Sequence, residues 1–130
     1  LFEDPAMEDL LWIAPQAAVE LDARGGAVFA DARYTTAFKL GHIRGAHSLP
    51  GGRSTHELGD IEHTEAFRAV LGSGARTLVV YSDGGSDLEP CAYLARRFRT
   101  HRSIPAHQVL RLVGGLTLWK RSGLPVDAHG

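Results

Sequence analysis

The residues best able to do chemistry lie between positions 82 and 91 of this 130-residue chain. Ser82 directly follows the apolar run "TLVVY" at 77–81, and a turn with two glycines and several carboxylates comes next. Cys91, the only cysteine of the chain, lies further along, just after Pro90. A buried strand that enters a glycine turn and then a helix places strand-end side chains beside the first N–H groups of that helix. This layout is typical of sites that use a nucleophile or bind an anion.

The elements that position these residues follow from the pattern of apolar side chains. Short runs rich in β-branched or aromatic residues predict strands at 27–31, 77–81 and 108–113. Stretches with helical spacing, two of them with a proline near the start, predict helices at 15–24, 62–71, 90–101 and 116–122. Because strands and helices alternate, we expect an α/β domain with a central parallel sheet of about five strands and helices on both faces.

Composition limits the classes of function. Fourteen Lys and Arg against fifteen Asp and Glu give a net charge of -1, so we expect neither nucleic-acid binding nor membrane contact by this domain. A single cysteine excludes an intrachain disulfide and fits a reducing compartment, which predicts a cytoplasmic protein. No run approaches the roughly 20 apolar residues that span a bilayer. The seven histidines lack the spacing of metal ligands, so no histidine metal site and no cofactor is expected.

Three blocks of sequence carry a resemblance to a known family. They are "DARYTTAFKLGHIRGAHSLP" at 31–50, "TLVVYS" at 77–82 and "LVGGLTLWKRSGLPV" at 112–126. In their content and order they resemble the rhodanese-like domains. The resemblance implies a rhodanese-like α/β sandwich over 13–126, with 1–12 as a linker or N-terminal extension and 127–130 as a tail. Members of that family include thiosulfate sulfurtransferases, persulfide carriers and Cdc25-type phosphatases.

The resemblance also implies where an active site would lie. In the family's enzymes a Cys at the strand end is the nucleophile, and the loop after it wraps an oxyanion; the matching residue in this chain is Ser82. The loop resembles the Cdc25 type in length, and its residues are Ser82, Asp83, Gly84, Gly85, Ser86, Asp87 and Leu88. Leu88 stands where the Cdc25 pattern has Arg, and Asp87 stands where the shorter sulfurtransferase loop has a basic residue.

Three residues outside the loop are implied by the resemblance to support it. Asp31 and Arg33 resemble the family's pair that organises the edge of the sheet near the active loop. His42 resembles the family's structural histidine. Many members have Glu where this chain has Ala37, so an ion pair from Arg33 to that position is not expected here.

The missing cysteine and the missing loop cation favour a protein that has lost catalysis. Serine lacks the thiolate that makes Cys nucleophilic near neutral pH, and no His lies close to Ser82 in the sequence. We therefore expect a catalytically inactive binding or regulatory module within a larger protein. The alternative is a sulfurtransferase or phosphatase with an atypical nucleophile. In that case Cys91 is the candidate sulfur acceptor, although its place in the first turn of a helix favours a buried, inert thiol.

Charged side chains predict two further binding surfaces. Asp83, Asp87 and Glu89 make the loop acidic, which favours a cationic partner, such as Lys or Arg of another protein or a metal ion, over an anion. A solvated acidic loop is the simpler interpretation. Four arginines near the end of the next helix form either a solvated face or a docking site for an acidic peptide: Arg96, Arg97, Arg99 and Arg102.

Overall fold

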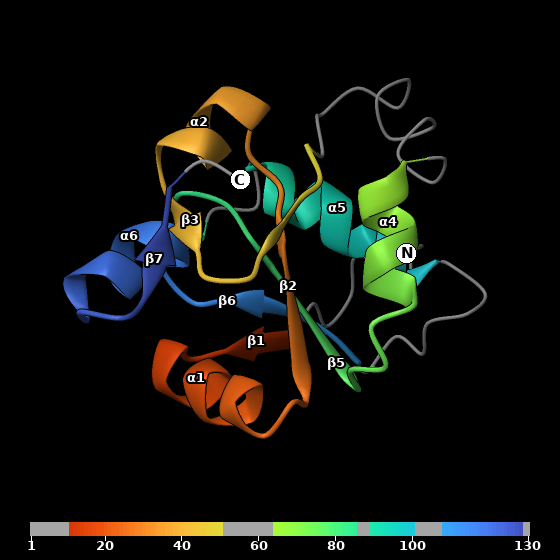
Figure 1. The fold of residues 1–130 in the computed structure, drawn as a ribbon, viewed down its shortest axis with the longest axis horizontal. Coiled ribbons are helices and arrows are strands. Elements are labelled where there is room, and N and C mark those ends of the chain that lie inside the picture. The colour runs from red at the N-terminus through yellow and green to blue at the C-terminus, as the bar shows by residue number, and fades with distance from the viewer. Residues whose placement is uncertain (1–10, 51–63, 86–88, 101–107, 129–130) are drawn as a thin grey trace, which may run out of the picture.

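The computed structural model describes residues 11–50, 64–85, 89–100 and 108–128. Five parallel strands form its central sheet in the order β1-β6-β5-β2-β4 (Figure 1). Their bounds are β1 Leu11–Ile13, β2 Ala27–Asp31, β4 His47–Ser48, β5 Thr77–Tyr81 and β6 Val109–Leu112. The predicted parallel sheet of five strands is confirmed. A second, antiparallel pair joins β3 (His42–Ile43) to β7 (Val126–Asp127).

The helices pack on both faces of this sheet, as predicted. They are α1 Pro15–Ala23, α2 Thr35–Leu40, α4 Glu65–Leu71, α5 Pro90–Arg99 and α6 Gly115–Arg121. Along β2, Val28 and Ala30 pack in one core, while Phe29 between them packs in the other. Successive strand side chains point to opposite faces, so one short apolar run serves both cores. α4 and α5 complete the first core, and α1 and α6 complete the second (Figure 1).

The parallel arrangement brings the carboxyl ends of β2 and β5 together. Asp31, the last residue of β2, pairs in register with Tyr81, the last residue of β5. Ser82 follows directly, so the predicted loop leaves the sheet beside the Asp31 side chain. Ligands of open α/β sheets bind at this carboxyl edge. The fold thus places Ser82 and Asp31 where the sequence predicts the site.

Two of the short strands lie across the predicted domain boundaries. The boundary predicted at residue 13 falls within β1, because Leu11 and Trp12 pair with Leu110 and Arg111 of β6. At the other end, the predicted tail begins at Asp127, which pairs with His42. Strands of two or three residues are too short for the alternation of polar and apolar side chains to reveal them.

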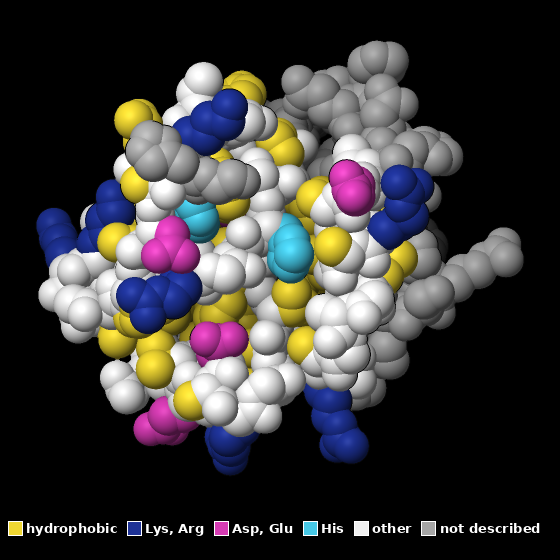
Figure 2. All heavy atoms as spheres, in the orientation of Figure 1, with side chains coloured by type: hydrophobic (Ala, Val, Ile, Leu, Met, Phe, Trp, Pro, Cys, Tyr) yellow, Lys and Arg dark blue, Asp and Glu magenta, His cyan; other side chains and the backbone are white. Residues whose placement is uncertain are grey.

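The surface carries charges of both signs. On the face drawn in Figure 2, Lys and Arg side chains are interspersed with Asp and Glu and with hydrophobic ones. Within the described residues, no helix is both long enough and apolar enough to cross a membrane.

Candidate active-site loop

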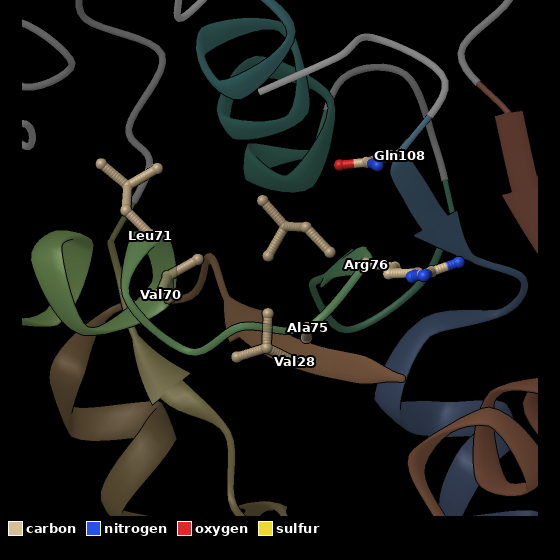
Figure 3. Close-up of a pocket in the computed structure, with 7 residues that line it drawn as sticks. Val28, Val70, Leu71, Ala75, Arg76 and Gln108 are labelled. Carbon is tan, nitrogen blue, oxygen red and sulfur yellow. The ribbon is translucent and has the colours of Figure 1, made fainter. Parts of the chain in front are cut away.

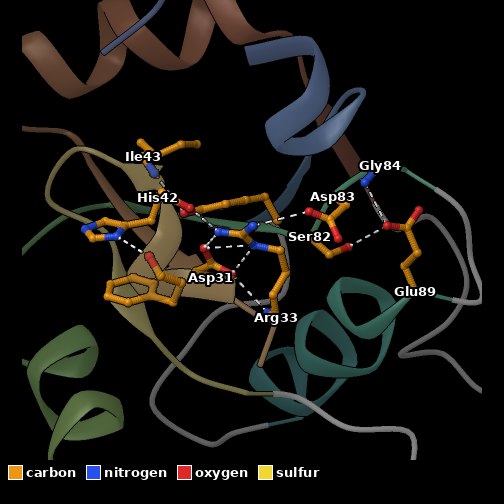
Figure 4. A network of polar contacts seen from close by, with 11 residues as sticks. Asp31, Arg33, His42, Ile43, Ser82, Asp83, Gly84 and Glu89 are labelled. Carbon is orange, nitrogen blue, oxygen red and sulfur yellow. Dashed lines mark hydrogen bonds and ion pairs between the residues drawn. The ribbon is translucent and has the colours of Figure 1, made fainter. Parts of the chain in front are cut away.

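Ser82 lies at the start of the loop, and its side chain is engaged by a carboxylate. Only 1% of Ser82 is exposed. Its Oγ donates a hydrogen bond to Glu89 Oε1 at 3.2 Å, and the Gly84 N–H donates to the same oxygen at 2.7 Å (Figure 4). Glu89 is the N-cap residue of α5, yet its side chain makes no capping bond to that helix. The Glu89 carboxylate therefore binds the first part of the loop.

The amino end of α6 holds the other side of the loop. Backbone N–H groups of Leu116 and Thr117 donate to the carbonyl oxygens of Ser82 and Asp83, at 2.9 and 3.0 Å. Gly115 has a φ of +57°, and a Cβ at this position would overlap the carbonyl oxygens of Ser82 and Gly84. Only glycine allows the two backbones to approach this closely. The helix thus fixes where Ser82 and Asp83 leave the sheet.

Arg33 joins the loop to the end of β2. Its Nη2 donates to Asp31 Oδ2 at 2.8 Å and its Nε donates to Asp31 Oδ1 at 3.0 Å. Its Nη1 reaches Asp83 Oδ1 at 3.3 Å (Figure 4). Burial lowers the pKa of the Arg33 guanidinium, but its neighbours, Asp31 foremost, together raise the pKa by more. The pair predicted to organise the sheet edge near the loop does form, and it extends to the loop itself.

Tyr81 and His42 complete the support beneath this pair. The Tyr81 hydroxyl accepts a hydrogen bond from the Ile43 N–H at 3.0 Å. Burial, followed by the charge and hydrogen bond of Asp31, raises the pKa of the Tyr81 phenol far above its ordinary value. His42 stacks on the Phe38 ring and its Nδ1 lies 2.7 Å from the Phe38 carbonyl oxygen. These two contacts tie the His42 ring to α2.

Arg111 of β6 is a site residue that the sequence reasoning missed. It is 1% exposed, and its guanidinium carbon lies 4.1 Å from the centre of the Trp12 ring. Its Nη2 lies 3.3 Å from the Gly85 carbonyl oxygen and 3.4 Å from Cys91 Sγ. A buried cation thus contacts the loop from below. The signal available was a lone arginine inside the otherwise apolar strand run "VLRLV", because a strand in mid-sheet buries both its faces.

Cys91 lies in the core rather than at the surface. It is 1% exposed and packs among the side chains between the sheet and α5. This agrees with a buried thiol. Ser86, Asp87 and Leu88 lie outside the described residues, so the predicted length of the loop and the positions of Asp87 and Leu88 stay predictions.

The arginines of α5 lie away from the loop, in the last turn of the helix. Arg96 stacks over the Tyr93 ring, with 4.5 Å between guanidinium carbon and ring centre. Arg102 lies outside the described residues. No group of three or more His, Cys, Asp and Glu side chains within the described residues is arranged to hold a metal ion.

A separate pocket lies near the amino ends of the strands, opposite the loop (Figure 3). Its volume is about 90 Å³, and it is lined by Val28, Val70, Leu71, Ala75, Arg76, Leu78 and Gln108. Its lining is mostly aliphatic and offers no nucleophile or carboxylate. We assign it no chemistry.

Comparison with known proteins identifies the family. The model of the rhodanese-like domain matches residues 14–122, which is most of the chain. The chain belongs to the rhodanese-like domain family. A thiosulfate sulfurtransferase GlpE from Pseudomonas putida (strain GB-1) is 32% identical over 124 residues, covering 95% of this chain and 97% of that protein.

Solved structures show that the rhodanese-like fold is shared. A thiosulfate sulfurtransferase from Pseudomonas aeruginosa superposes with a TM-score of 0.67 at 24% identity, over 96% of this chain and 21% of that chain. A possible tyrosine phosphatase from Rhodopseudomonas palustris CGA009 gives a TM-score of 0.66 at 20% identity, over 94% of this chain and 88% of that chain. The fold therefore supports the predicted rhodanese-like sandwich.

Proposed function

We propose that this rhodanese-like domain does not transfer sulfur and acts as a binding or regulatory module. The observation that carries the proposal is Ser82, which stands at the strand end where the family resemblance places the nucleophilic Cys. Its hydroxyl is buried and donates to the Glu89 carboxylate. Sulfur transfer through an enzyme persulfide needs a thiolate, and a serine hydroxyl can neither form a persulfide nor ionise near neutral pH.

The chain has a single thiol that could take part in such a reaction. Because Cys91 is the only cysteine of these 130 residues, a persulfide on this chain must form there. The residue is 1% exposed, and its Sγ lies 3.4 Å from Arg111 Nη2. A thiosulfate ion has to approach the thiolate along the sulfur–sulfur bond that is being broken. Burial of Cys91 in the native fold opposes that approach.

Sulfurtransferase activity is the second candidate, and the relatives favour it. The thiosulfate sulfurtransferases of Pseudomonas putida match this chain over nearly their whole length. In this case Cys91 would have to accept sulfur after a local opening of α5 or of the loop. A phosphatase with an atypical nucleophile has less support, because its likeness rests on folds at 20% identity.

The test is the intact mass of the folded protein after incubation with thiosulfate and removal of the excess. The Pseudomonas putida relative serves as positive control for the assay, and a Cys91→Ala variant serves as the matched negative. We expect the native chain to gain no sulfur and to show no thiosulfate:cyanide sulfurtransfer. A gain of one sulfur by the native chain, lost in Cys91→Ala, refutes the proposal and establishes the second candidate.

For the partner, we propose a protein segment that carries Lys or Arg. Asp83 supports this choice, because its side chain is 72% exposed while Arg33 contacts one of its oxygens. Calorimetric titration with a short lysine-rich peptide, compared between the native domain and Asp83→Asn, checks the choice. Binding should weaken with salt and with the substitution. Equal binding by both proteins would place the partner elsewhere.

A further inference from the structure

The Glu89 carboxylate lies against the backbone at the start of the loop. One oxygen accepts hydrogen bonds from the Gly84 N–H at 2.7 Å and from the Ser82 hydroxyl at 3.2 Å. The other oxygen is so close to Gly84 that a Cβ added there would lie 2.9 Å from it. The carboxylate therefore rests against the loop backbone (Figure 4). In other proteins, backbone N–H groups of a glycine-rich loop that leads into a helix hold a phosphate or sulfate.

The contacts of Glu89 differ from those of an ordinary helix cap. A capping side chain accepts a hydrogen bond from an N–H two or three residues further along its own helix. Glu89 makes no such bond to α5 and reaches back five residues to Gly84 and seven to Ser82. Thr64 at the start of α4 provides the contrast within the chain, since its side chain accepts from the Phe67 N–H in the usual way. The Glu89 side chain thus serves the loop.

A bound carboxylate excludes an oxyanion in two ways. The Gly84 N–H has one hydrogen, and Glu89 already accepts it. The fixed negative charge also repels a second anion at short range, where the protein screens less well than water. We propose that Glu89 is an internal ligand of Ser82 and Gly84, a built-in carboxylate that keeps tetrahedral oxyanions such as phosphate and thiosulfate from binding at these two residues.

This inference goes beyond the proposed function, because it concerns access of anions to the loop and not the nucleophile. It holds whether or not the chain transfers sulfur through Cys91. The two ideas also fail separately. Covalent uptake of sulfur refutes the binding role, whereas reversible anion binding by the native loop refutes the role of Glu89.

The experiment compares anion binding by the native domain with binding by Glu89→Gln and Glu89→Ala. Calorimetry with inorganic phosphate and with thiosulfate measures the dissociation constant, and circular dichroism checks that each variant is folded. We expect no saturable binding by the native domain. For Glu89→Ala we expect a dissociation constant at least tenfold below the lower limit that the titration sets for the native domain. Glu89→Gln keeps the shape of the side chain and removes its charge, so it should lie between the two.

Glu65→Gln is the matched control, because Glu65 is a carboxylate at the start of α4 as Glu89 is at the start of α5. It should bind anions no better than the native domain. An equal gain in Glu65→Gln would reduce the effect to overall charge and overturn the proposal. So would folded Glu89 variants that bind anions no better than the native domain.

A measurement on the native protein does not depend on how the variants fold. The amide resonance of Gly84 reports on the N–H that Glu89 occupies. It should stay unchanged as phosphate is added to the native domain. A saturable shift of this resonance would show that phosphate binds at the loop despite Glu89, and the proposal would be wrong.

Discussion

Replacing Arg33 with methionine should destabilise the domain far more than replacing an exposed arginine. The guanidinium donates to both oxygens of Asp31 and to the Gly41 carbonyl oxygen, and it reaches Asp83. The side chains of Arg33 and Asp31 are 9% and 0% exposed. Methionine retains most of the apolar stem of arginine but leaves the Asp31 carboxylate buried without its counter-charge. Removing one partner of a buried pair costs about 3–5 kcal/mol of unfolding free energy.

The exposed pair of Arg44 and Asp127 is the control. Its side chains are 67% and 47% exposed, and its closest atoms, Arg44 Nε and Asp127 Oδ1, are 3.6 Å apart. Exposed pairs contribute about 0–1 kcal/mol, so Arg44→Met should have a correspondingly small effect. Urea unfolding of the native domain and of both variants measures the difference, with the slope of each transition showing whether unfolding stays two-state.

A double-mutant cycle separates the pair from its surroundings. Asp31→Asn alone leaves Arg33 charged and buried, whereas the double variant leaves neither charge behind. We expect a coupling energy of about 2–3 kcal/mol, at the upper end of the range for side chains in contact. A coupling below about 0.5 kcal/mol, or equal losses for Arg33→Met and Arg44→Met, would refute the reasoning that burial makes this pair strong.

Two further predictions follow from the backbone and from titration. Gly115→Ala should destabilise the domain by several kcal/mol, because its Cβ would overlap the Ser82 and Gly84 carbonyl oxygens. Gly25→Ala, with positive φ but no atom within 4 Å of its Cβ, should cost only about 1–2 kcal/mol. Equal losses in thermal or urea unfolding would contradict the close approach of α6 to the loop. The pKa of Tyr81 is raised in the folded state. Its contribution to the free energy of unfolding is therefore complete below the ordinary tyrosine pKa near 10. Above that pH the contribution is lost, at about 1.4 kcal/mol per pH unit. Urea unfolding at pH 9 and 11 should therefore show a steeper alkaline loss for the native domain than for Tyr81→Phe, and parallel losses would contradict the raised pKa.

The position of the candidate site was predictable because it depends on the backbone pattern. "TLVVY" is a buried strand in both the prediction and the structure, and Ser82 follows it. The end of β2 came from the same pattern at 27–31. The pairing of Asp31 with Arg33 could be predicted only from the family resemblance. An Asp and an Arg two residues apart at the end of a strand do not by themselves predict an ion pair.

The partners of individual side chains were not predictable in the same way. The contact of Glu89 with Gly84 joins residues five positions apart outside any helix, and no spacing in the sequence encodes it. The stacking of Arg111 on Trp12 depends on β1, of which Leu11 and Trp12 fall in the predicted linker and Ile13 in the predicted domain. The position of β1 is determined by its pairing with β6, which is a tertiary contact that local sequence does not specify.

The charge of the loop shows why contiguous sequence misleads about electrostatics. Read along the chain, "SDGGSDLE" has three carboxylates and no cation. In the folded structure, Arg33 near the end of β2 contacts Asp83, and Arg111 of β6 contacts the Gly85 carbonyl oxygen. Both guanidinium groups belong to buried residues, so their charges are screened less by water than exposed ones would be. The attraction for a cationic partner must therefore be weaker than three carboxylates suggest. Among the described loop residues it rests on Asp83, whose side chain faces solvent.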